Sequence, residues 1–583
     1  MMSDNTVTTV KSVEKFSIID EVKLFLKEML KEKYIEEKQI QDKKYVIRTT
    51  PEYIRPIVDY MIRRDARLVH LTVSDEGVNG FEVQYHYGFD HLEKNTHFII
   101  KVRVPRENPE IPSISPITWQ ASWAEREMMD LLGVKFTGHP DPRHLFLPYE
   151  WPEEPESEKV DGFSLYTKRD KSAYYIRKEL GKWVPLALSP ADAKLTLLPI
   201  GPYHPMFIES EYFRVRVEGD EIVDVDMKTG FNHRGVMRLA EQRHYARIPF
   251  LVERVCGICS TTHATAYCNT VEAMLKLDIP DRAKYIRTII LELERLHSHL
   301  IWLGVAGDLI GFKTLFMWAL RDREHVLDLF EKLTGNRVHH DIVYLGGVRK
   351  DISEAHIPEI LRRINFIEES VKKYIDIAYD HPVVKARTMD IGLLTLTTAK
   401  DAGAVGPTAR GSDWKIDARS SNPYAAYGPE YTTWDIITES GCDVWSRLVV
   451  RLKEMLVSCD IIRQSVERMK KTSPDLRVKP QLPEDGAEAV NKTEAPRGEL
   501  YYYVKSNGTS IPHTVRIRTP SYRNDAVLPF MLRGQTLSDA PIIIGSIDPC
   551  FSCTDRMIRI EDTKTNQVRF ERIGDIARKY RRA

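Results

Sequence analysis

The chain has little cysteine and no excess of charge of either sign. Only 7 of its 583 residues are cysteine, and 84 lysines and arginines are balanced by 84 aspartates and glutamates. So few cysteines exclude the disulfide framework of a small secreted domain. The balanced charge provides no overall field that would favour nucleic acid as a partner. The hydrophobic content of 42% is that of a globular protein, and the length predicts about two to four domains.

Targeting and membrane-spanning segments are also missing from the sequence. The N-terminus has no basic segment followed by an apolar run, so no signal peptide is expected. The most apolar long stretch runs from His299 to Leu320, but Asp308 and Lys313 interrupt it near its centre. Charged side chains there would be costly in a bilayer. We therefore predict a buried core helix at this position, and a soluble chain that can dock on a membrane protein.

The first 155 residues contain no cysteine and are predicted to form a separate α+β domain. Apolar and polar residues alternate over 68–73, 81–87 and 97–104, as in half-buried antiparallel strands, and a helix is expected at Ile19–Lys33. A charged segment with proline follows at 153–159, so we place a linker at 156–194.

The rest of the chain, up to residue 556, is predicted to be a mainly α domain, a helical bundle with small β elements. Short strand signals occupy Leu197–Asp226, and from about Pro249 helical patterns dominate. A helical apolar stripe runs from Ile286 to Leu303, and further helices are expected at 324–334, 357–378 and 433–469. Proline and charge in 472–494 predict a surface loop.

Four of the seven cysteines form two short pairs, Cys256 with Cys259 and Cys550 with Cys553. In a Cys-x-x-Cys turn both sulfurs can face one ion, and Gly257 keeps the first turn open. Burying four thiolates without a cation would cost several kcal/mol per charge, so a soft metal is expected if the fold brings the pairs together. From the spacing alone, structural zinc and a dithiol redox pair both remain open.

Other cysteines and histidines are weaker candidates for ligands. His297 and His299 are two residues apart on a predicted helix and point to opposite faces, so they are poor partners for one ion. The three remaining cysteines lack partners at metal-binding spacing and are predicted to be buried apolar thiols; they are Cys268, Cys442 and Cys459.

The residues flanking the pairs resemble a known family. Glu253 to His263 and Asp548 to Arg556 closely resemble the two metal-binding signatures of the nickel–iron hydrogenase large subunit. The ending Thr554-Asp-Arg556 resembles its energy-converting, complex-I-related group. Further landmarks of the resemblance, which covers 195–556, are 201–205, 233–235, 294–300, 345–349, 406–410 and 494–498.

The N-terminal region carries a second resemblance. Residues 125–143 resemble the thirty-kilodalton subunit of respiratory complex I. Fusion of the two modules resembles large subunits of the formate hydrogenlyase type. The implied fold of the second module is that of the hydrogenase large subunit and the complex I forty-nine-kilodalton subunit.

The resemblance implies a role for each cysteine of the two pairs. Cys256 and Cys550 are implied to be terminal nickel ligands, while Cys259 and Cys553 bridge nickel to an iron that carries two cyanides and one carbon monoxide. Soft thiolates suit such a centre. The implied activity is the reversible reduction of protons to hydrogen, with the Cys550 thiolate as the proton-accepting base.

Other residues of the resemblance surround that centre. Arg497 is implied to overhang the metals, where it polarises hydrogen or binds cyanide, and Asp548 either orients Arg497 or caps its own turn. Glu209 is implied to be the proton-relay carboxylate, with Glu211 as its competitor. His263 is implied to help form the pocket around the metals.

One position departs from the family pattern. Relatives carry an acidic residue shortly after His233-Arg-Gly235, but this chain has Met237 there, and Glu241 is one turn further on. This argues against an accessory magnesium or iron ion in this chain.

The resemblance also implies partners and a location. Electrons come from an iron–sulfur cluster in a separate small subunit, because too few cysteines remain here for a cluster. Other implied partners are further iron–sulfur subunits, antiporter-like membrane-arm subunits, nickel-insertion factors and a maturation protease that removes 557–583 after Arg556. The implied location is cytoplasmic, peripheral on the inner face of the cell membrane.

Two other functions remain in competition at this point. A fused complex-I-like module that reduces quinone without nickel or iron would have the same fold, but needs none of the four cysteines. A binding or assembly protein with structural zinc is the other. The electron donor stays open among formate, carbon monoxide dehydrogenase and ferredoxin.

Overall fold

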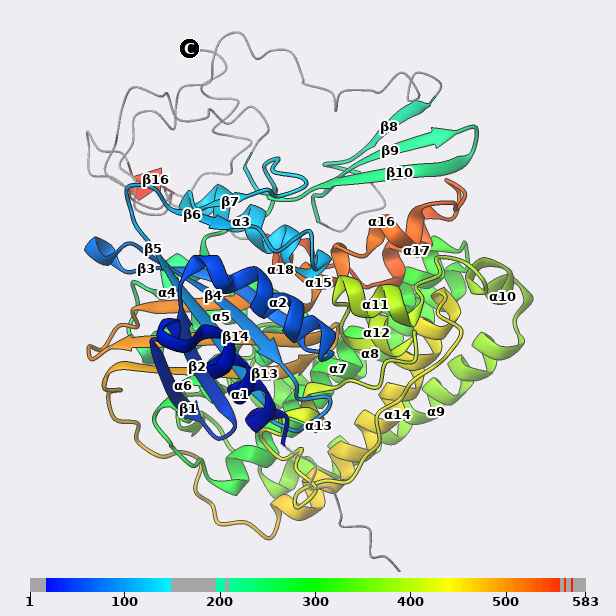
Figure 1. The fold of residues 1–583 in the computed structure, drawn as a ribbon. Helices are drawn as coiled ribbons and strands as arrows, with labels where there is room; N and C mark the ends of the chain where they lie inside the picture. The colour runs from blue at the N-terminus through cyan, green and yellow to red at the C-terminus, as the bar shows by residue number, and fades with distance from the viewer. Residues whose placement is uncertain (1–16, 148–194, 205–208, 556–559, 562–567, 570–583) are drawn as a thin grey trace, which may run out of the picture.

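A computed structural model describes residues 17–147, 195–204 and 209–555, together with two short paired strands, β16 (Ile560–Glu561) and β17 (Val568–Arg569) (Figure 1). The predicted linker at 156–194 lies outside the described residues, and so does the predicted tail at 557–583 apart from the residues of β16 and β17.

The N-terminal region is built on a five-stranded sheet with the order β1-β2-β5-β4-β3, here called the N-terminal sheet. Its neighbouring strands are antiparallel except β2 and β5, which are parallel. The bounds are β1 Glu36–Gln41, β2 Lys44–Thr49, β3 Arg67–Asp75, β4 Phe81–Gly88 and β5 His97–Val104. Helices α1 (Ile18–Leu30) and α2 (Ile54–Arg63) bury apolar side chains in the same core. The predicted helix and all three predicted strands are confirmed.

The prediction that these strands are half-buried is wrong. All eight residues of β4 are buried, and so are the first eight of β3, including polar residues such as Glu82, Gln84 and His86. The second face is covered because strands from residues 485–507 pack on it, with Tyr501 and Tyr503 contacting β4 and β5. Local alternation therefore identified the strands but not their second neighbour.

Helix α3 (Ser122–Leu132) and the parallel strands β6 (Glu110–Pro112) and β7 (Lys135–Thr137) complete this region. Two carboxylates of α3 hold neighbouring loops. Glu125 accepts hydrogen bonds from the Ile114 amide and the Ser115 hydroxyl, and Asp130 accepts from the amides of residues 145 and 146, each at 2.8 Å. Backbone amides and a serine hydroxyl thus satisfy these two buried carboxylates of α3.

Two small sheets follow in the second region. One projects from the upper edge of the molecule with the order β10-β9-β8 (Figure 1); its strands are β8 Thr196–Ile200, β9 Tyr212–Glu218 and β10 Glu221–Lys228. The other has the order β13-β14-β15; its strands are β13 Asp485–Ala495, β14 Gly498–Asn507 and β15 Thr514–Arg518. We call β13 and β14 the hairpin.

The predicted surface loop at 472–494 is therefore wrong over its second half. Strand β13 is buried from Glu488 onward. Its charged side chains form ion pairs with residues of the neighbouring elements; for example, Lys492 bonds Asp90 at 2.6 Å. A charged residue in a sequence predicts a solvent-exposed side chain only when no buried residue of opposite charge pairs with it.

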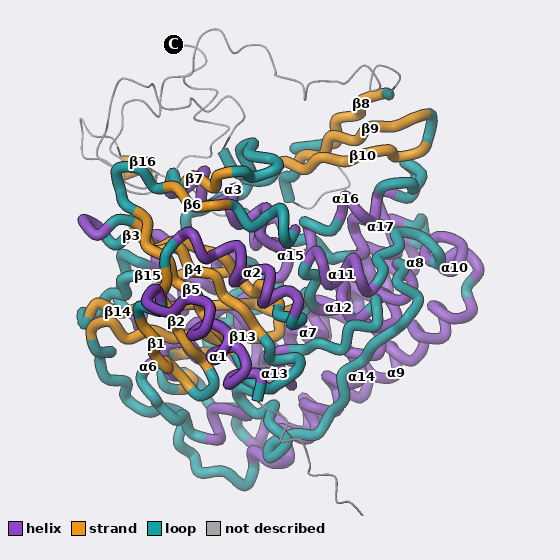
Figure 2. The backbone as a smooth tube through the Cα atoms, viewed as in Figure 1, coloured by secondary structure: helices purple, strands orange, loops and turns teal. Residues whose placement is uncertain are grey.

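Four long helices form the mainly α part of the fold (Figure 2). They pack on one another, α7 with α8 and α14, and α9 with α8 and α14. Their bounds are α7 Asp281–Leu309, α8 Lys313–Thr334, α9 Ile357–Asp380 and α14 Val444–Met469. The bounds of the shorter helices are α4 Val236–Ala240, α5 Ile248–Val252, α6 Ser260–Met274, α10 Pro382–Thr388, α11 Leu396–Ala402, α12 Gly406–Arg410, α13 Ala418–Ser421, α15 Pro520–Asp525, α16 Leu528–Leu532, α17 Ala540–Ser546 and α18 Phe551–Thr554. A two-stranded ribbon, β11 Val343–Tyr344 with β12 Gly347–Val348, lies between α8 and α9 in sequence.

Two helix boundaries differ from the prediction. The expected single helix at His299–Leu320 is two helices, because α7 ends and α8 begins on either side of Gly311, whose φ of 82° no helix can continue. The helix expected at 433–469 starts only at residue 444, because Asp443 caps it by accepting from the Ser446 amide at 2.8 Å.

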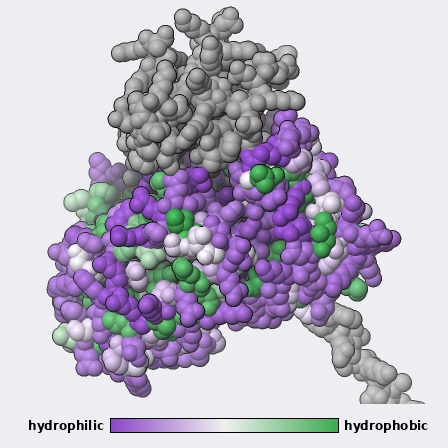
Figure 3. Space-filling view, turned by 90° about the vertical axis from the view of Figure 1, so that its left-hand side faces the viewer, coloured by the Kyte–Doolittle hydropathy of each residue, from purple (hydrophilic) through white to green (hydrophobic). Residues whose placement is uncertain are grey.

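The described helices include none that is long and apolar enough to cross a bilayer. On the face drawn in Figure 3, hydrophobic residues are scattered among a majority of hydrophilic ones.

The interior of the helical part contains buried ion pairs. Arg410 on α12 bonds Glu454 of α14 and Glu494 of the hairpin, each at 2.7 Å, and all three are almost fully buried. Breaking a buried pair is costly because the remaining charge stays desolvated. These contacts tie α12, α14 and the hairpin into one unit.

We predict that Arg410→Met lowers the free energy of unfolding by about 3–5 kcal/mol, since it leaves two buried carboxylates without their cation. Denaturant unfolding of the purified chain measures this. The matched control is Lys453→Met on α14. It removes the ion pair between Lys453, whose side chain is 35% exposed, and Glu439, and it should cost at most about 1 kcal/mol. Equal losses in both variants would contradict the stabilising role of the Arg410 pairs.

Candidate metal centre

Both cysteine pairs lie where a loop turns into a helix. Cys259 is the residue before α6, and Cys550 is the residue before α18, which contains Cys553. All four side chains are buried, with 0 to 4% of each residue exposed. The turns present the sulfurs to one enclosed space although 294 residues separate the pairs.

The sulfurs associate across the pairs. Cys256 Sγ lies 3.5 Å from Cys550 Sγ, and Cys259 Sγ lies 3.9 Å from Cys553 Sγ. These separations exclude a disulfide, whose sulfurs are about 2.05 Å apart. They bracket the roughly 3.8 Å expected for two sulfurs on one tetrahedral ion with bonds of about 2.3 Å. The ligand atoms of Cys256, Cys550 and Cys553 all lie within 4.8 Å of one another.

The thiols alone cannot all be ionised near neutral pH. Hydrogen bonds from the other three cysteines hold the pKa of Cys256 well below its usual value. The same bonds raise the pKa values of Cys259, Cys550 and Cys553 well above theirs. The protein by itself thus favours one thiolate among four sulfurs. Full deprotonation requires a bound cation, so this donor set fits a soft metal centre.

Arg497 occupies the tip of the hairpin and faces the cysteines. It donates from Nε to the Asp548 carbonyl and from Nη2 to Asp548 Oδ1, both at 2.7 Å, and it is 3% exposed. Burial would lower the pKa of Arg497, but the charges of Asp548 and of Cys550 and Cys256 outweigh it and raise that pKa well above its usual value. Asp548, with φ of 57°, holds the guanidinium through both its backbone and its side chain.

The hairpin tip crosses the backbone before α12 at very short range. A Cβ on Gly406 would lie 2.3 Å from the Arg497 carbonyl oxygen, and one on Gly498 would lie 2.6 Å from the Gly406 nitrogen. Only glycine allows this approach. The crossing places the hairpin tip directly against the backbone that precedes α12.

The two competing carboxylates occupy different positions. Glu209 Oε2 accepts a hydrogen bond of 2.6 Å from the Ser552 amide, between Cys550 and Cys553. Glu211 is fully buried, and burial raises its pKa well above the usual value, with Asp555 and Asp525 adding to the effect. Glu209 is therefore the carboxylate in contact with the second cysteine turn.

His263 lies on the first turn of α6 beside the cysteines. Its ligand atom lies within 4.8 Å of the sulfurs of Cys259 and Cys553, and its Nδ1 is 2.8 Å from the Tyr502 hydroxyl. Tyr502 belongs to β14, so this contact links α6 to the hairpin.

Met237 and Glu241 lie toward β15. The Met237 sulfur is 3.3 Å from the Ile517 amide, and Glu241 forms an ion pair with Arg516. The Glu241 carboxylate is thus paired with Arg516 and does not take the place of the acid that Met237 replaces.

His297 and His299 contact different helices, as expected for residues two apart. Arg323 of α8 donates to His297 Nδ1 at 3.2 Å, and His299 Nε2 lies 2.9 Å from Glu454 of α14. Cys268 and Cys459 are buried as predicted, but Cys442 is only partly buried, because it lies in the irregular segment before α14 at φ of 63°.

Several polar residues at the centre were not predicted. Ser521 Oγ accepts from the Cys550 amide at 3.2 Å, and Thr519 donates to the Cys553 carbonyl at 2.9 Å. Glu294 accepts from the amides of Thr261 and Thr262, and burial raises its pKa to about 7. Only Glu294 had a sequence signal, as a landmark of the resemblance. The others have no spacing typical of a site.

Comparison with known proteins places both regions of the chain in described families. Residues 309–483 and 477–556 match the family described as respiratory-chain NADH dehydrogenase, 49 Kd subunit. Residues 47–163 match the 30 Kd subunit of the same enzyme, and residues 234–304 match nickel-dependent hydrogenase.

Two curated relatives extend over most of the chain. Formate hydrogenlyase subunit 5 of Escherichia coli strain K12 is 36% identical over 481 residues, which cover 81% of this chain and 82% of the relative. Hydrogenase-4 component G of the same strain is 35% identical over 518 residues, which cover 87% of each chain.

A solved structure shares the fold over 63% of this chain. A chain from the membrane-bound sulfane sulfur reductase, an archaeal respiratory membrane complex, aligns with a TM-score of 0.60 and 29% identity, covering 63% of this chain and 100% of that one. The mixed α/β fold is therefore of the complex I 49 Kd-subunit type. On these matches and on the four buried cysteines, the chain belongs to the complex-I-related nickel–iron hydrogenase large subunits that carry a fused 30 Kd-subunit-like region.

Proposed function

We propose that this chain is the catalytic large subunit of a membrane-associated hydrogenase of the formate hydrogenlyase type, which reversibly reduces protons to hydrogen. The observation that carries the proposal is the meeting of four buried cysteine sulfurs from two distant turns, 3.5 and 3.9 Å apart across the pairs. A complex-I-like quinone reductase needs no such thiol set.

The grouping of the sulfurs supports a nickel–iron centre. Cys256 and Cys550 would hold nickel as terminal ligands, while Cys259 and Cys553 would bridge nickel and an iron carrying two cyanides and one carbon monoxide. When bound, this centre supplies the redox chemistry that interconverts protons and hydrogen. Cys553 belongs to both close groups of ligand atoms, which suits a bridging position.

The chain's own residues handle the proton. The Cys550 sulfur is the base nearest to the proposed reaction site. Glu209 accepts a hydrogen bond from the amide of Ser552, two residues after Cys550. A carboxylate in that position can take a proton from the thiol and pass it toward the surface, since Glu209 is itself only partly buried.

Arg497 supplies a fixed positive charge on the other side of the sulfurs. Its two hydrogen bonds to Asp548 orient the guanidinium, which leaves Nη1 for the iron-bound cyanide or for hydrogen. Asp548 is thus a positioning residue, and His263 completes the wall of the pocket near Cys259 and Cys553.

We divide the chain into a 30 Kd-subunit-like α+β domain at 1–155, a linker at 156–194, a mainly α catalytic domain at 195–556 and an extension at 557–583 removed on maturation. The arrangement of the described elements supports the order, with the five-stranded sheet before residue 147 and the long helices after residue 280. The accessory magnesium or iron ion is omitted, because Met237 replaces the acid.

The relatives are named as a subunit and a component, which supports a complex of several subunits. The partners that the family resemblance implies are an iron–sulfur small subunit, further iron–sulfur subunits, antiporter-like membrane-arm subunits, and the nickel-insertion factors and protease of maturation. The proposed location is the cytoplasmic inner face of the membrane.

The decisive test is metal and infrared analysis of the chain purified in its complex from a nickel-replete host. We expect about one nickel per chain, as the four-cysteine donor set implies, and infrared bands of iron-bound cyanide and carbon monoxide, which distinguish the iron of this centre from the iron of the iron–sulfur subunits. Cys553→Ser should lose the nickel and these bands, whereas Cys459→Ser, a buried thiol far from the turns in sequence, should keep them. Zinc without nickel, and without hydrogen-dependent dye reduction, would favour the structural-zinc alternative.

Glu209 and Glu211 can be separated by matched variants. We expect Glu209→Gln to slow hydrogen turnover and proton–deuterium exchange by about 10²–10⁴-fold, because an amide cannot relay the proton. Glu211→Gln should retain turnover within a few-fold, since no hydrogen bond among the described residues joins the Glu211 carboxylate to the cysteine turn. Both variants should keep nickel. A slow Glu211→Gln with a normal Glu209→Gln would transfer the relay to Glu211.

The extension can be tested on the same preparation. Mass spectrometry of the active, nickel-loaded chain should place its C-terminus at Arg556, and chain made without nickel should end at Ala583. A nickel-loaded and fully active chain that still ends at Ala583 would disprove removal.

A further inference from the structure

A row of ion pairs joins the N-terminal sheet to the hairpin. The members of each pair lie far apart in sequence, one on the sheet or its loops and one on β13 or β14. They are Lys505–Glu76 at 2.7 Å, Lys101–Glu488 at 2.7 Å, Lys492–Asp90 at 2.6 Å and Arg67–Glu499 at 2.7 Å. An apolar cluster that includes Val69, Ile99, Val490 and Tyr501 fills the space between them.

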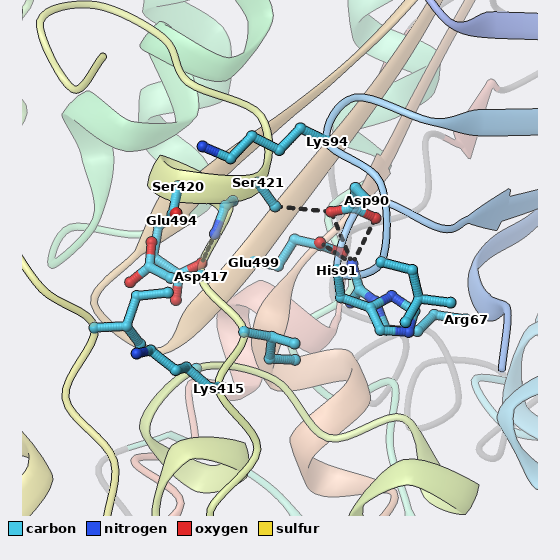
Figure 4. Close-up of a pocket in the computed structure, with 15 residues that line it drawn as sticks. Arg67, Asp90, His91, Lys94, Lys415, Asp417, Ser420, Ser421, Glu494 and Glu499 are labelled. Atoms are coloured by element: carbon cyan, nitrogen blue, oxygen red, sulfur yellow. Dashed lines mark hydrogen bonds and ion pairs between the residues drawn. The ribbon is translucent and has the colours of Figure 1, made fainter. Parts of the chain in front are cut away.

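The pairs nearest the hairpin tip form a connected network around Arg67 (Figure 4). Arg67 Nη2 donates to both Asp90 oxygens, at 3.2 and 3.3 Å, and to Glu499 Oε2. Asp90 also accepts from Lys492 and from the Ser421 hydroxyl. All of the charged members are at least 90% buried, so the bonds are charge-assisted and little screened by solvent.

This network lies directly behind Arg497. In the register of the hairpin, Glu494 is opposite Glu499 and Ala495 is opposite Gly498, which leaves Pro496 and Arg497 as the turn. Glu499 is therefore two residues after Arg497, at the start of β14. Any shift of Glu499 relative to the sheet moves the backbone that carries the guanidinium.

On this side the steric contact of the tip is its crossing with Gly406, and side chains do not fill the space beside it. A cavity of about 210 Å³ lies between the N-terminal sheet and the segment 415–421. Arg67, Asp90, Glu494 and Glu499 line it (Figure 4), and so does Gly406. Where side chains leave space, directional bonds rather than van der Waals contact determine position.

We propose that Arg67 of the N-terminal region is a positioning residue for Arg497. Through Glu499 it holds the hairpin tip at the depth where Arg497 bonds Asp548 and faces the cysteine sulfurs. The 30 Kd-subunit-like region thus takes part in building the metal centre, in addition to any part it has in docking. The proposal rests on the proposed function for the role of Arg497, but the clamp itself is a property of the protein.

The chain offers a variant that removes the clamp without stranding a charge. In Arg67→Met, Asp90 keeps Lys492 and Ser421, and Glu499 keeps Arg518. Arg67→Lys keeps the charge, but its ammonium sits on a more flexible chain than the Nη2 that bonds both carboxylates. The matched control is Lys505→Met, which removes a pair of the same kind about 23 Å along β14 from Gly498, at about 3.3 Å per residue.

Two measurements on the intact complex test the clamp. Amide hydrogen exchange of the peptide covering 494–500 should be about tenfold faster in Arg67→Met, because losing a charge-assisted bond favours local opening. The infrared cyanide bands should shift in the same variant. Arg67→Lys should give intermediate values, and Lys505→Met should match the wild type in both measurements.

Each result has one meaning. Unchanged exchange and unchanged cyanide bands in Arg67→Met would overturn the clamp, and so would equal changes in Lys505→Met, which would indicate general loosening of the interface. If wild-type protein has no cyanide bands, the proposed function fails while the exchange data still decide the clamp. If Arg67→Met does not accumulate, Arg67→Lys decides by the same two readings.

Discussion

The structure depends on the enclosure of four cysteine sulfurs that repel one another when ionised. Two turns bring Cys256 and Cys259 against Cys550 and Cys553, and the surrounding protein leaves only one of these thiols acidic. Everything adjacent to them is arranged around that charge. Two helices start at the turns, Ser521 and Thr519 fix the backbone of the second turn, and Arg497 brings a permanent cation to the side where negative charge accumulates.

The sequence predicted local features well and long-range ones poorly. The cysteine pairs, the strands at 68–104 and most helices were recognisable because their signals are short or periodic. The burial of β13 was missed because Lys492 and Glu488 look like surface residues until Asp90 and Lys101, some 400 residues away, are seen opposite them. Ser521 and Thr519 were missed for the same reason, since a hydroxyl carries no sign of which backbone it will bond.

Buried polar groups with distant partners are the common element of these misses. The chain also pairs a number of charges inside the fold, where Arg410, Arg287 and Arg518 are among the largest fully buried side chains. Such pairs add little to net stability relative to apolar packing, but they define position sharply, because a displaced partner leaves an uncompensated ion. A metal centre with a required distance between guanidinium and sulfur benefits from that kind of rigidity. Ion pairs link the N-terminal sheet, the hairpin and the long helices in turn.

The 294 residues between the cysteine pairs also set an order of events during biosynthesis. A ribosome working at about 5–20 residues per second needs roughly 15 to 60 s to travel from the first pair to the second. Throughout most of that interval Cys256 and Cys259 exist without their partners, and α6, which follows them, still lacks the hairpin on which it packs. The site is therefore complete only when α18, which contains Cys553, packs beside the first pair. A metal that occupies the centre has to enter before or during that step.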